Sequence, residues 1–171
     1  MIFRLSQKLA KKVKVGKLPE MPLAENPYAD WSCHVFTANR TQHIILSNTA
    51  SMYSCVMFGK GITDDSRFID RALTTIREFM EDDGEQFAYR KFVKPEGETI
   101  SFARPLNRSV TGSMNELIMA AEMYLIEDEM APHDVGFKLN GLLLSILKDG
   151  EGRKYGEPKD AFKRLASNPA K

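Results

Sequence analysis

The sequence predicts a single α+β domain over residues 1–171, in which an antiparallel sheet, made of a meander plus a hairpin, packs against three to four helices. The first observation is that residues 31–58 hold three short runs of β-branched, aromatic and aliphatic residues separated by turns containing Asn and Ser. The second is the amphipathic segment that follows, from Asp64 to about Asp82, which we expect to cover the meander. The third is composition, because 171 residues with 43% hydrophobic and 27% charged residues are typical of one globular domain.

The register of the meander follows from its first turn. We place this turn at Asn39 and Arg40, because Asn tolerates the positive φ of a two-residue hairpin turn. The turn predicts three cross-strand pairs: Val35 with Ile44, Cys33 with Leu46, and Trp31 with Asn48. With a four-residue second loop, one face is apolar and consists of Trp31, Cys33, Val35, Ile44, Leu46, Tyr53, Cys55 and Met57. The other face is mixed, so either a helix covers it or it holds a polar site; it consists of Ser32, His34, Phe36, His43, Ile45, Ser47, Met52 and Ser54.

The two cysteines, Cys33 and Cys55, are predicted to lie on strands separated by the central one. Two steps across a sheet cover about 10 Å, whereas a disulfide needs Cα atoms within about 7 Å. We therefore expect two buried free thiols in a reducing compartment and a cytoplasmic protein.

The segments on either side of the meander predict further elements. Residues 2–5 are expected to form a short strand, and Ser6 to cap a helix that runs to about Val13. Residues 86–93 and 99–103 are expected to form the hairpin around a turn at residues 95–98.

Three helices are predicted in the C-terminal half. Ser113 and Glu116 have the spacing of a capping box, which predicts a helix from Met114 to about Glu127. Pro132 suits the first turn of the next helix, with apolar residues at helical spacing: Val135, Leu139, Leu142, Leu143 and Ile146. A short helix is expected from Pro158 to about Ala166. Glycines at positions 150, 152 and 156 indicate flexibility within residues 149–171.

Several kinds of chemistry have no support in the sequence. The motifs HExxH, CxxC, GxSxG, GxGxxG and GxxxxGK[ST] are absent, so no catalytic residue is assigned and a non-enzymatic protein is favoured. His34 and His43 share a predicted face, but zinc needs at least a third ligand, and half-buried histidines are the favoured interpretation. We expect no metal and no cofactor. We also expect no membrane segment, because no apolar run approaches the roughly 18 residues that a span needs.

Two sets of residues are candidates for binding. The first combines guanidinium, amide and hydroxyl groups near turns and a helix start: Arg40, Asn48, Thr49, Asn107, Arg108, Ser109 and Asn115. The alternative, which is favoured, is that these residues serve turns and caps and that Arg108 pairs with an acid. The second set is Lys8, Lys11 and Lys12, which are candidates for phosphate contact; here too a solvated helix face is favoured.

A family resemblance is visible in three segments, residues 1–12, 26–65 and 107–125. They include MIFRLSQKLAKK, NPYADWSCHVFTANR and NRSVTGSMNELIMAAEMYL. In these segments the chain resembles a bacterial family of short cytoplasmic proteins that is known as a domain of unknown function. The likeness reaches about Asn140 and leaves the C-terminal segment outside. It implies a bacterial protein with an α+β fold, and nothing about a substrate.

Two functions are consistent with these observations. The favoured one is a non-enzymatic interaction protein of a mobile-element or toxin–antitoxin type, with an unknown protein partner or self-association through exposed residues such as Met21, Met52 and Met130. The alternative is a nucleic-acid or nucleotide-phosphate binder or hydrolase that uses the basic N-terminal helix with Arg40 and Arg108. The net charge of +1 gives no global attraction for nucleic acid, so this alternative is not favoured.

Overall fold

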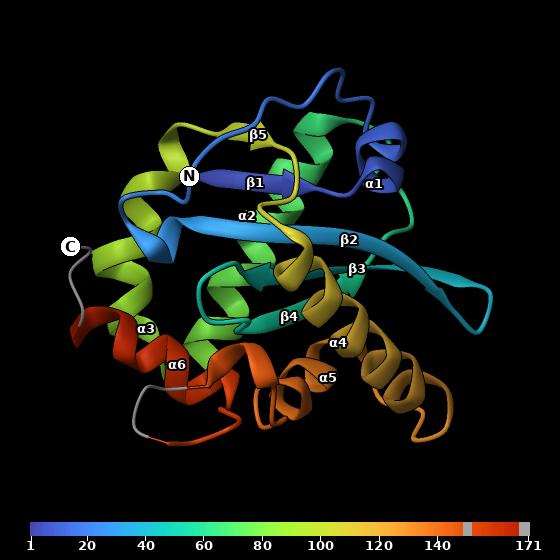
Figure 1. Ribbon diagram of the computed structural model, residues 1–171. Helices are drawn as coiled ribbons and strands as arrows, with labels where there is room; N and C mark the ends of the chain where they lie inside the picture. The colour runs from blue at the N-terminus through green and yellow to red at the C-terminus, as the bar shows by residue number, and fades with distance from the viewer. Residues whose placement is uncertain (149–151, 168–171) are drawn as a thin grey trace.

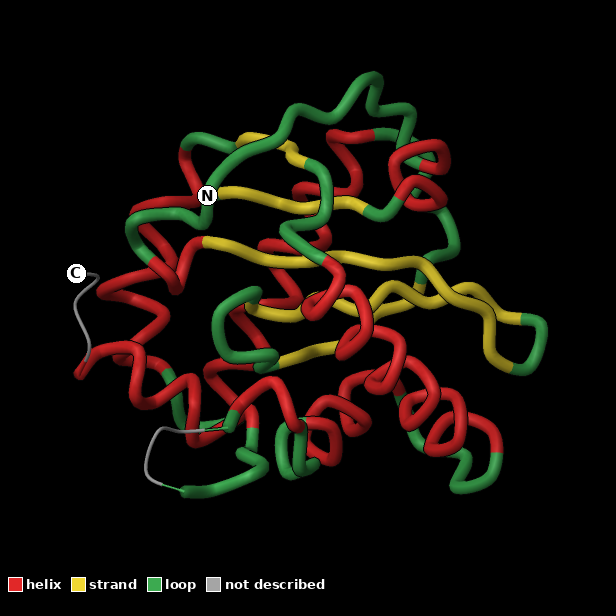
Figure 2. Tube along the Cα trace, in the orientation of Figure 1, coloured by secondary structure: helices red, strands yellow, loops and turns green. Residues whose placement is uncertain are grey.

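A computed structural model describes residues 1–148 and 152–167 and shows an α+β fold with a central sheet between two helical layers (Figures 1 and 2). The strands are β1 Ile2–Leu5, β2 Asp30–Ala38, β3 Thr41–Asn48, β4 Ser54–Phe58 and β5 Ser101–Ala103. The helices are α1 Gln7–Lys12, α2 Asp65–Asp82, α3 Gln86–Ala88, α4 Arg108–Ile126, α5 Pro132–Leu139 and α6 Pro158–Arg164. Shorter helical turns are η1 Pro27–Ala29, η2 Tyr89–Val93, η3 Lys94–Glu98, η4 Ser145–Leu147 and η5 Leu165–Ser167.

The predicted meander is confirmed in its register. Asn39 and Arg40 have φ values of 48° and 61°, which is the left-handed conformation that a tight hairpin turn requires. Three pairs match the prediction: Trp31 with Asn48, Cys33 with Leu46, and Val35 with Ile44. Cys55 pairs with Leu46 from the other side, so the two thiols are separated by β3, and both are buried and free.

The indole-and-thiol face of the meander is the main core, as predicted. Trp31, Cys33 and Leu46 are fully buried there. The amphipathic helix α2 covers this face with residues spaced by one helical turn: Phe68, Ala72, Ile76, Phe79 and Met80. Helix α1 and Phe162 of α6 join the same core, whereas α4 and α5 pack on the opposite face around Ile45 and Val56 (Figure 1).

The predicted hairpin at residues 86–103 is wrong, and the sheet is mixed rather than antiparallel. Residues 86–93 are helical, because their aromatic side chains find their packing from helical turns, as in the stack of Phe92 on Tyr28 at 4.7 Å between ring centroids. Strand β5 instead pairs in parallel with β1, and β1 pairs in parallel with β2, which gives the order β4-β3-β2-β1-β5.

The predicted capping box at Ser113 and Glu116 is also wrong. Helix α4 begins earlier, with Asn107 as its N-cap, because the Asn107 side-chain oxygen accepts a hydrogen bond of 2.9 Å from the backbone N–H of Val110. Ser113 therefore lies inside the helix, where it is buried.

The helix predicted at Pro132 is present as α5, but it ends at Leu139. The next residue, Asn140, is the C-cap of α5, and its side chain binds the backbone of the edge strand β4. Its oxygen accepts from the N–H of Ser54 at 2.7 Å, and its amide donates to the carbonyl of Ser54 at 2.9 Å. Leu142, Leu143 and Ile146 consequently lie in turns and in η4 rather than in α5.

The short C-terminal helix is confirmed as α6, and it is anchored to the core. Phe162 is fully buried and stacks on Tyr53, with ring centroids 4.2 Å apart. The Tyr28 hydroxyl donates to the carbonyl of Phe162 at 3.1 Å, and Lys159 forms an ion pair with Asp83 at 2.7 Å. The flexibility expected for residues 149–171 stays a prediction, and residues 149–151 and 168–171 lie outside the described part of the chain.

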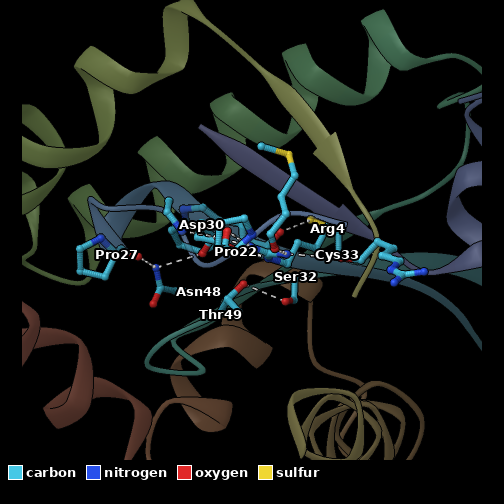
Figure 3. Close-up of polar contacts among 12 residues, drawn as sticks. Arg4, Pro22, Pro27, Asp30, Ser32, Cys33, Asn48 and Thr49 are labelled. Carbon is cyan, nitrogen blue, oxygen red and sulfur yellow. Dashed lines mark hydrogen bonds and ion pairs between the residues drawn. The ribbon is translucent and has the colours of Figure 1, made fainter. Parts of the chain in front are cut away.

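A buried ion pair joins the two central parallel strands (Figure 3). The Arg4 guanidinium on β1 donates two hydrogen bonds of 2.8 Å to the two carboxylate oxygens of Asp30 on β2. Its other donors reach the carbonyls of Met21, Pro22 and Arg104. The two side chains are 1% and 0% exposed, so the guanidinium is satisfied entirely by protein groups.

Replacing one partner of this pair is expected to destabilise the fold strongly. Arg4→Met leaves the Asp30 carboxylate buried without its cation, which costs about 3–5 kcal/mol of unfolding free energy, and Asp30→Leu has the converse effect. The double variant is expected to lose less than the sum of the two single losses, because it leaves neither charge unpaired. Urea unfolding of the four proteins measures this, and additive losses would contradict the coupling.

Candidate functional site

The structure does not bring the first set of candidate residues to one place. Arg40 lies in the turn at one end of β3 and Asn48 lies at its other end. The eight residues of an extended strand span roughly 25 Å, so these two side chains cannot contact one small ligand. Asn107, Arg108 and Ser109 lie together at the start of α4, and Asn115 is exposed farther along that helix.

Asn48 and Thr49 are buried and have structural partners (Figure 3). The Asn48 amide donates to the carbonyls of Pro27 at 2.8 Å and Asp30 at 3.3 Å, and its oxygen accepts from the backbone N–H and hydroxyl of Ser51. These bonds use both donors and the acceptor of the side chain. The Thr49 and Ser32 hydroxyls lie 2.8 Å apart and share a hydrogen bond. Both residues therefore stabilise the end of the meander.

The three candidate lysines lie on α1 and near it. Lys8 and Lys11 are exposed, whereas Lys12 donates a hydrogen bond of 2.7 Å to the Gln42 side chain on β3. Lys11 lines a groove of about 590 Å³ at the carboxyl ends of the parallel strands β1 and β5. Arg104 lines the same groove and forms an ion pair with Glu20. The remaining lining is mostly apolar, which does not favour an anion.

The histidines do not form a metal centre. His43 lies between Phe36 and Phe58, with ring centroids 5.5 and 5.4 Å away, and its Nδ1 contacts the carbonyl of Thr41 at 3.1 Å. His133 contacts Asp82 on α2. Across residues 1–148 and 152–167, no group of three or more His, Cys, Asp or Glu side chains could hold a metal ion.

Helix α4 has an exposed apolar face that the sequence reasoning missed. Met119, Met123 and Ile126 are 71%, 44% and 48% exposed, and their spacing of four and three residues places them on one side of the helix. The buried side of α4 is the opposite one and consists of Val110, Met114, Leu117 and Ala121. We call the exposed side, Met119, Met123 and Ile126, the outer stripe. The sequence does contain a sign of this stripe, because apolar residues occur at helical spacing on two opposite sides of the same helix.

The methionines expected to be exposed contacts are placed differently. Met52 is 1% exposed and belongs to the core between the sheet and α4, so that expectation is wrong for this residue. Met21 and Met130 are half-buried. Met52 lies in the tight turn between β3 and β4, with a φ of 60°, and its side chain packs with the residues between the sheet and α4.

Acidic residues border the outer stripe on both sides. At about 100° per residue, Glu122 projects on one side of the stripe, and Glu116 and Glu127 project on the other. Asp128 and Glu129 follow the helix. Residues 109–131 contain these five acids and no Lys, Arg or His, so the stripe lies in a negative field.

A groove of about 540 Å³ runs beside the first three turns of α4. The helix contributes Ser109, Gly112, Ser113 and Glu116. The facing wall comes from η4 and the residues near α6: Ser145, Ile146, Lys148, Lys154 and Tyr155. Ser109 is the one residue of the first predicted set that lines this groove.

The comparison with known families agrees with the resemblance in the sequence. The family model described as Domain of unknown function (DUF6933) matches residues 2–161. The chain belongs to this family. The match runs past Asn140 into α6, so the family likeness includes residues 141–161 of the segment that we expected to lie outside it. No curated protein matches the chain. In the part of the chain that the structure describes, no helix is long and apolar enough to cross a membrane.

The buried histidines predict sensitivity to acid. Burial lowers the pKa of His34 and of His43 below the ordinary value of 6.5. As the pH falls below about 6.5, the unfolded chain therefore binds protons that the folded chain does not, and stability decreases. His34→Gln is expected to flatten this decrease between pH 7 and pH 5, as measured by urea midpoints. His133→Gln, at the exposed Asp82 pair, is the control. Equal pH profiles for wild type and His34→Gln would contradict the assignment.

Proposed function

We propose that this protein is a non-enzymatic interaction protein that binds a basic, apolar segment of a partner protein on the outer stripe of α4. The observation that carries the proposal is the exposure of Met119, Met123 and Ile126 opposite the buried side of the same helix. A helix that is apolar on both sides is normally buried on both. The outer stripe is therefore suited to burial against another molecule.

Helix α2 provides an internal comparison for this argument. Its outward face is charged and polar, and consists of Arg67, Asp70, Arg71, Thr74, Arg77, Glu78 and Glu81. The two long helices of one protein thus differ: α2 presents charge to solvent, and α4 presents two methionines and an isoleucine. Methionine is flexible and polarizable, which suits a surface that adapts to a partner.

The acids around the outer stripe determine the kind of partner. Five acidic residues within residues 109–131 attract a positively charged segment. Self-association through this face would bring two such acidic surfaces together, so a second copy of the chain is not the occupant that the charges favour. A basic amphipathic helix fits best, because it can place apolar residues on the stripe and its Lys or Arg residues against the acids.

A model peptide tests the proposal. A labelled 18-residue helix with Leu at heptad spacing and Lys elsewhere is expected to bind, as measured by fluorescence anisotropy. A peptide with the same spacing and Glu in place of Lys is expected not to bind. Met119→Gln with Met123→Gln should weaken binding at least tenfold, because it removes the apolar contact of the stripe without changing its charge. Thr74→Gln with Glu78→Gln on the exposed face of α2 is the control and should leave the affinity within about twofold.

Charge reversal separates the acidic border from the apolar stripe. Glu122→Lys with Glu127→Lys should weaken binding of the basic peptide several-fold at low salt and less at high salt, because exposed charges are screened. Unchanged peptide affinity in both stripe and border variants would overturn the proposal. Tight binding of single- or double-stranded nucleic acid that is lost on Lys8→Glu with Lys11→Glu would favour the nucleic-acid alternative instead.

A further inference from the structure

The groove beside α4 has the size of a small-molecule site and a wall made mostly of polar residues. Its volume of about 540 Å³ falls within the range of roughly 300–1,000 Å³ that is typical of ligand pockets. Hydroxyl groups come from Ser109, Ser113, Ser145 and Tyr155, and cations come from Lys148 and Lys154. These groups belong to segments far apart in the sequence, and they face one another across the groove.

Ser113 is the residue whose side chain offers an unused hydrogen-bonding group to the groove. It is only 5% exposed, yet its hydroxyl has no hydrogen-bond partner among the described residues. The neighbouring hydroxyl of Thr111 behaves differently and donates to the carbonyl of Asn107 at 3.1 Å. Among the described residues, every fully buried side-chain N or O atom has a partner. The Ser113 hydroxyl is therefore reachable from the groove, where a bound molecule can pair with it.

An oxyanion is favoured by the two lysines that line the groove. Lys148 and Lys154 line it, and neither forms an ion pair with an acid in the described part of the chain. The groove also includes Ser109 in the first turn of this 19-residue helix, where the α4 dipole is positive. Gly112 leaves the helix surface open, since a Cβ placed there would meet nothing within 4 Å.

Two other residues of the groove, Glu116 and Tyr155, determine which organic group can carry the oxyanion. Glu116 accepts hydrogen bonds and repels a second anionic group, so it favours a ligand with hydroxyl donors beside it. Tyr155 is 54% exposed and offers a flat surface for a sugar or a base. We infer that this groove binds a small organic phosphate of the sugar phosphate or nucleoside monophosphate class, with its phosphate at Ser113, Lys148 and Lys154 and its hydroxyl-bearing part between Glu116 and Tyr155. The apolar residues of the outer stripe take no part in this site; Glu116 alone lies both beside the stripe and in the groove.

Calorimetry and backbone amide NMR with three probes test the site. Ribose 5-phosphate and AMP are expected to bind and to shift the amide signals of Ser109, Gly112 and Ser113, whereas adenosine is expected to do neither. If AMP binds but ribose 5-phosphate and adenosine do not, the result also supports the inference, because AMP differs from adenosine only in its phosphate. Equal binding of adenosine and AMP, or no binding of either phosphate, would overturn the inference.

Three variants locate the binding. Lys148→Gln with Lys154→Gln should weaken phosphate binding at least tenfold, and Ser113→Ala should weaken it several-fold. Gly112→Leu fills the groove and should abolish binding without lowering the urea midpoint, because Leu has a higher helix propensity than Gly. Lys8→Gln with Lys11→Gln on α1 is the matched control for charge and should bind as the wild type does. Equal losses in the α1 control and in the groove variants would overturn the assignment of the site.

Discussion

The Arg4–Asp30 ion pair is the interaction on which the arrangement of the sheet depends. It lies where the N-terminal strand β1 enters between β2 and β5, and its guanidinium also holds the carbonyls of Met21 and Pro22 from the loop that covers this part of the sheet. Burying two charges is costly unless every hydrogen bond is made, so any shift of β1 along β2 would leave the pair incomplete. The ion pair therefore specifies one register for β1, and this register in turn positions α1, which follows β1 directly.

The meander could be predicted because its information is local. Asn39 and Arg40 adjoin the two strands that they connect, and the alternation of side chains then determines which residues reach the core. The rest of the sheet could not be derived in this way. β5 has only three residues, and its partner β1 lies at the other end of the sequence, so neither a turn nor an alternating pattern marks their parallel pairing. The aromatic residues at 86–93 suit a strand or a helix equally well, and their conformation is decided by tertiary contacts such as the stack of Phe92 on Tyr28.

Residue type was a poor guide to the candidate site for a physical reason. Amides and hydroxyls that can bind ligands are the same groups that cap helices and stabilise turns. Asn48 and Asn107 serve these structural purposes, and only Ser109 of the first predicted set lines the groove beside α4. Gly112, Lys148 and Tyr155 are unremarkable in sequence and become a group only because η4 and the residues before α6 pack along α4. The outer stripe was easier to recognise in principle, since it needs only the spacing of Met119, Met123 and Ile126.

The contact of Asn140 with Ser54 has a consequence for how the molecule can assemble. One amide side chain occupies the backbone N–H and carbonyl of Ser54, the first residue of the edge strand β4. At the other edge, the residue after the short strand β5 donates its N–H to the carbonyl of Pro19. Each border of the sheet thus has one backbone position that is already occupied, and a foreign strand adding there by β-augmentation would have to displace that contact. These two contacts therefore disfavour growth by strand addition at the Ser54 end of β4 and next to β5.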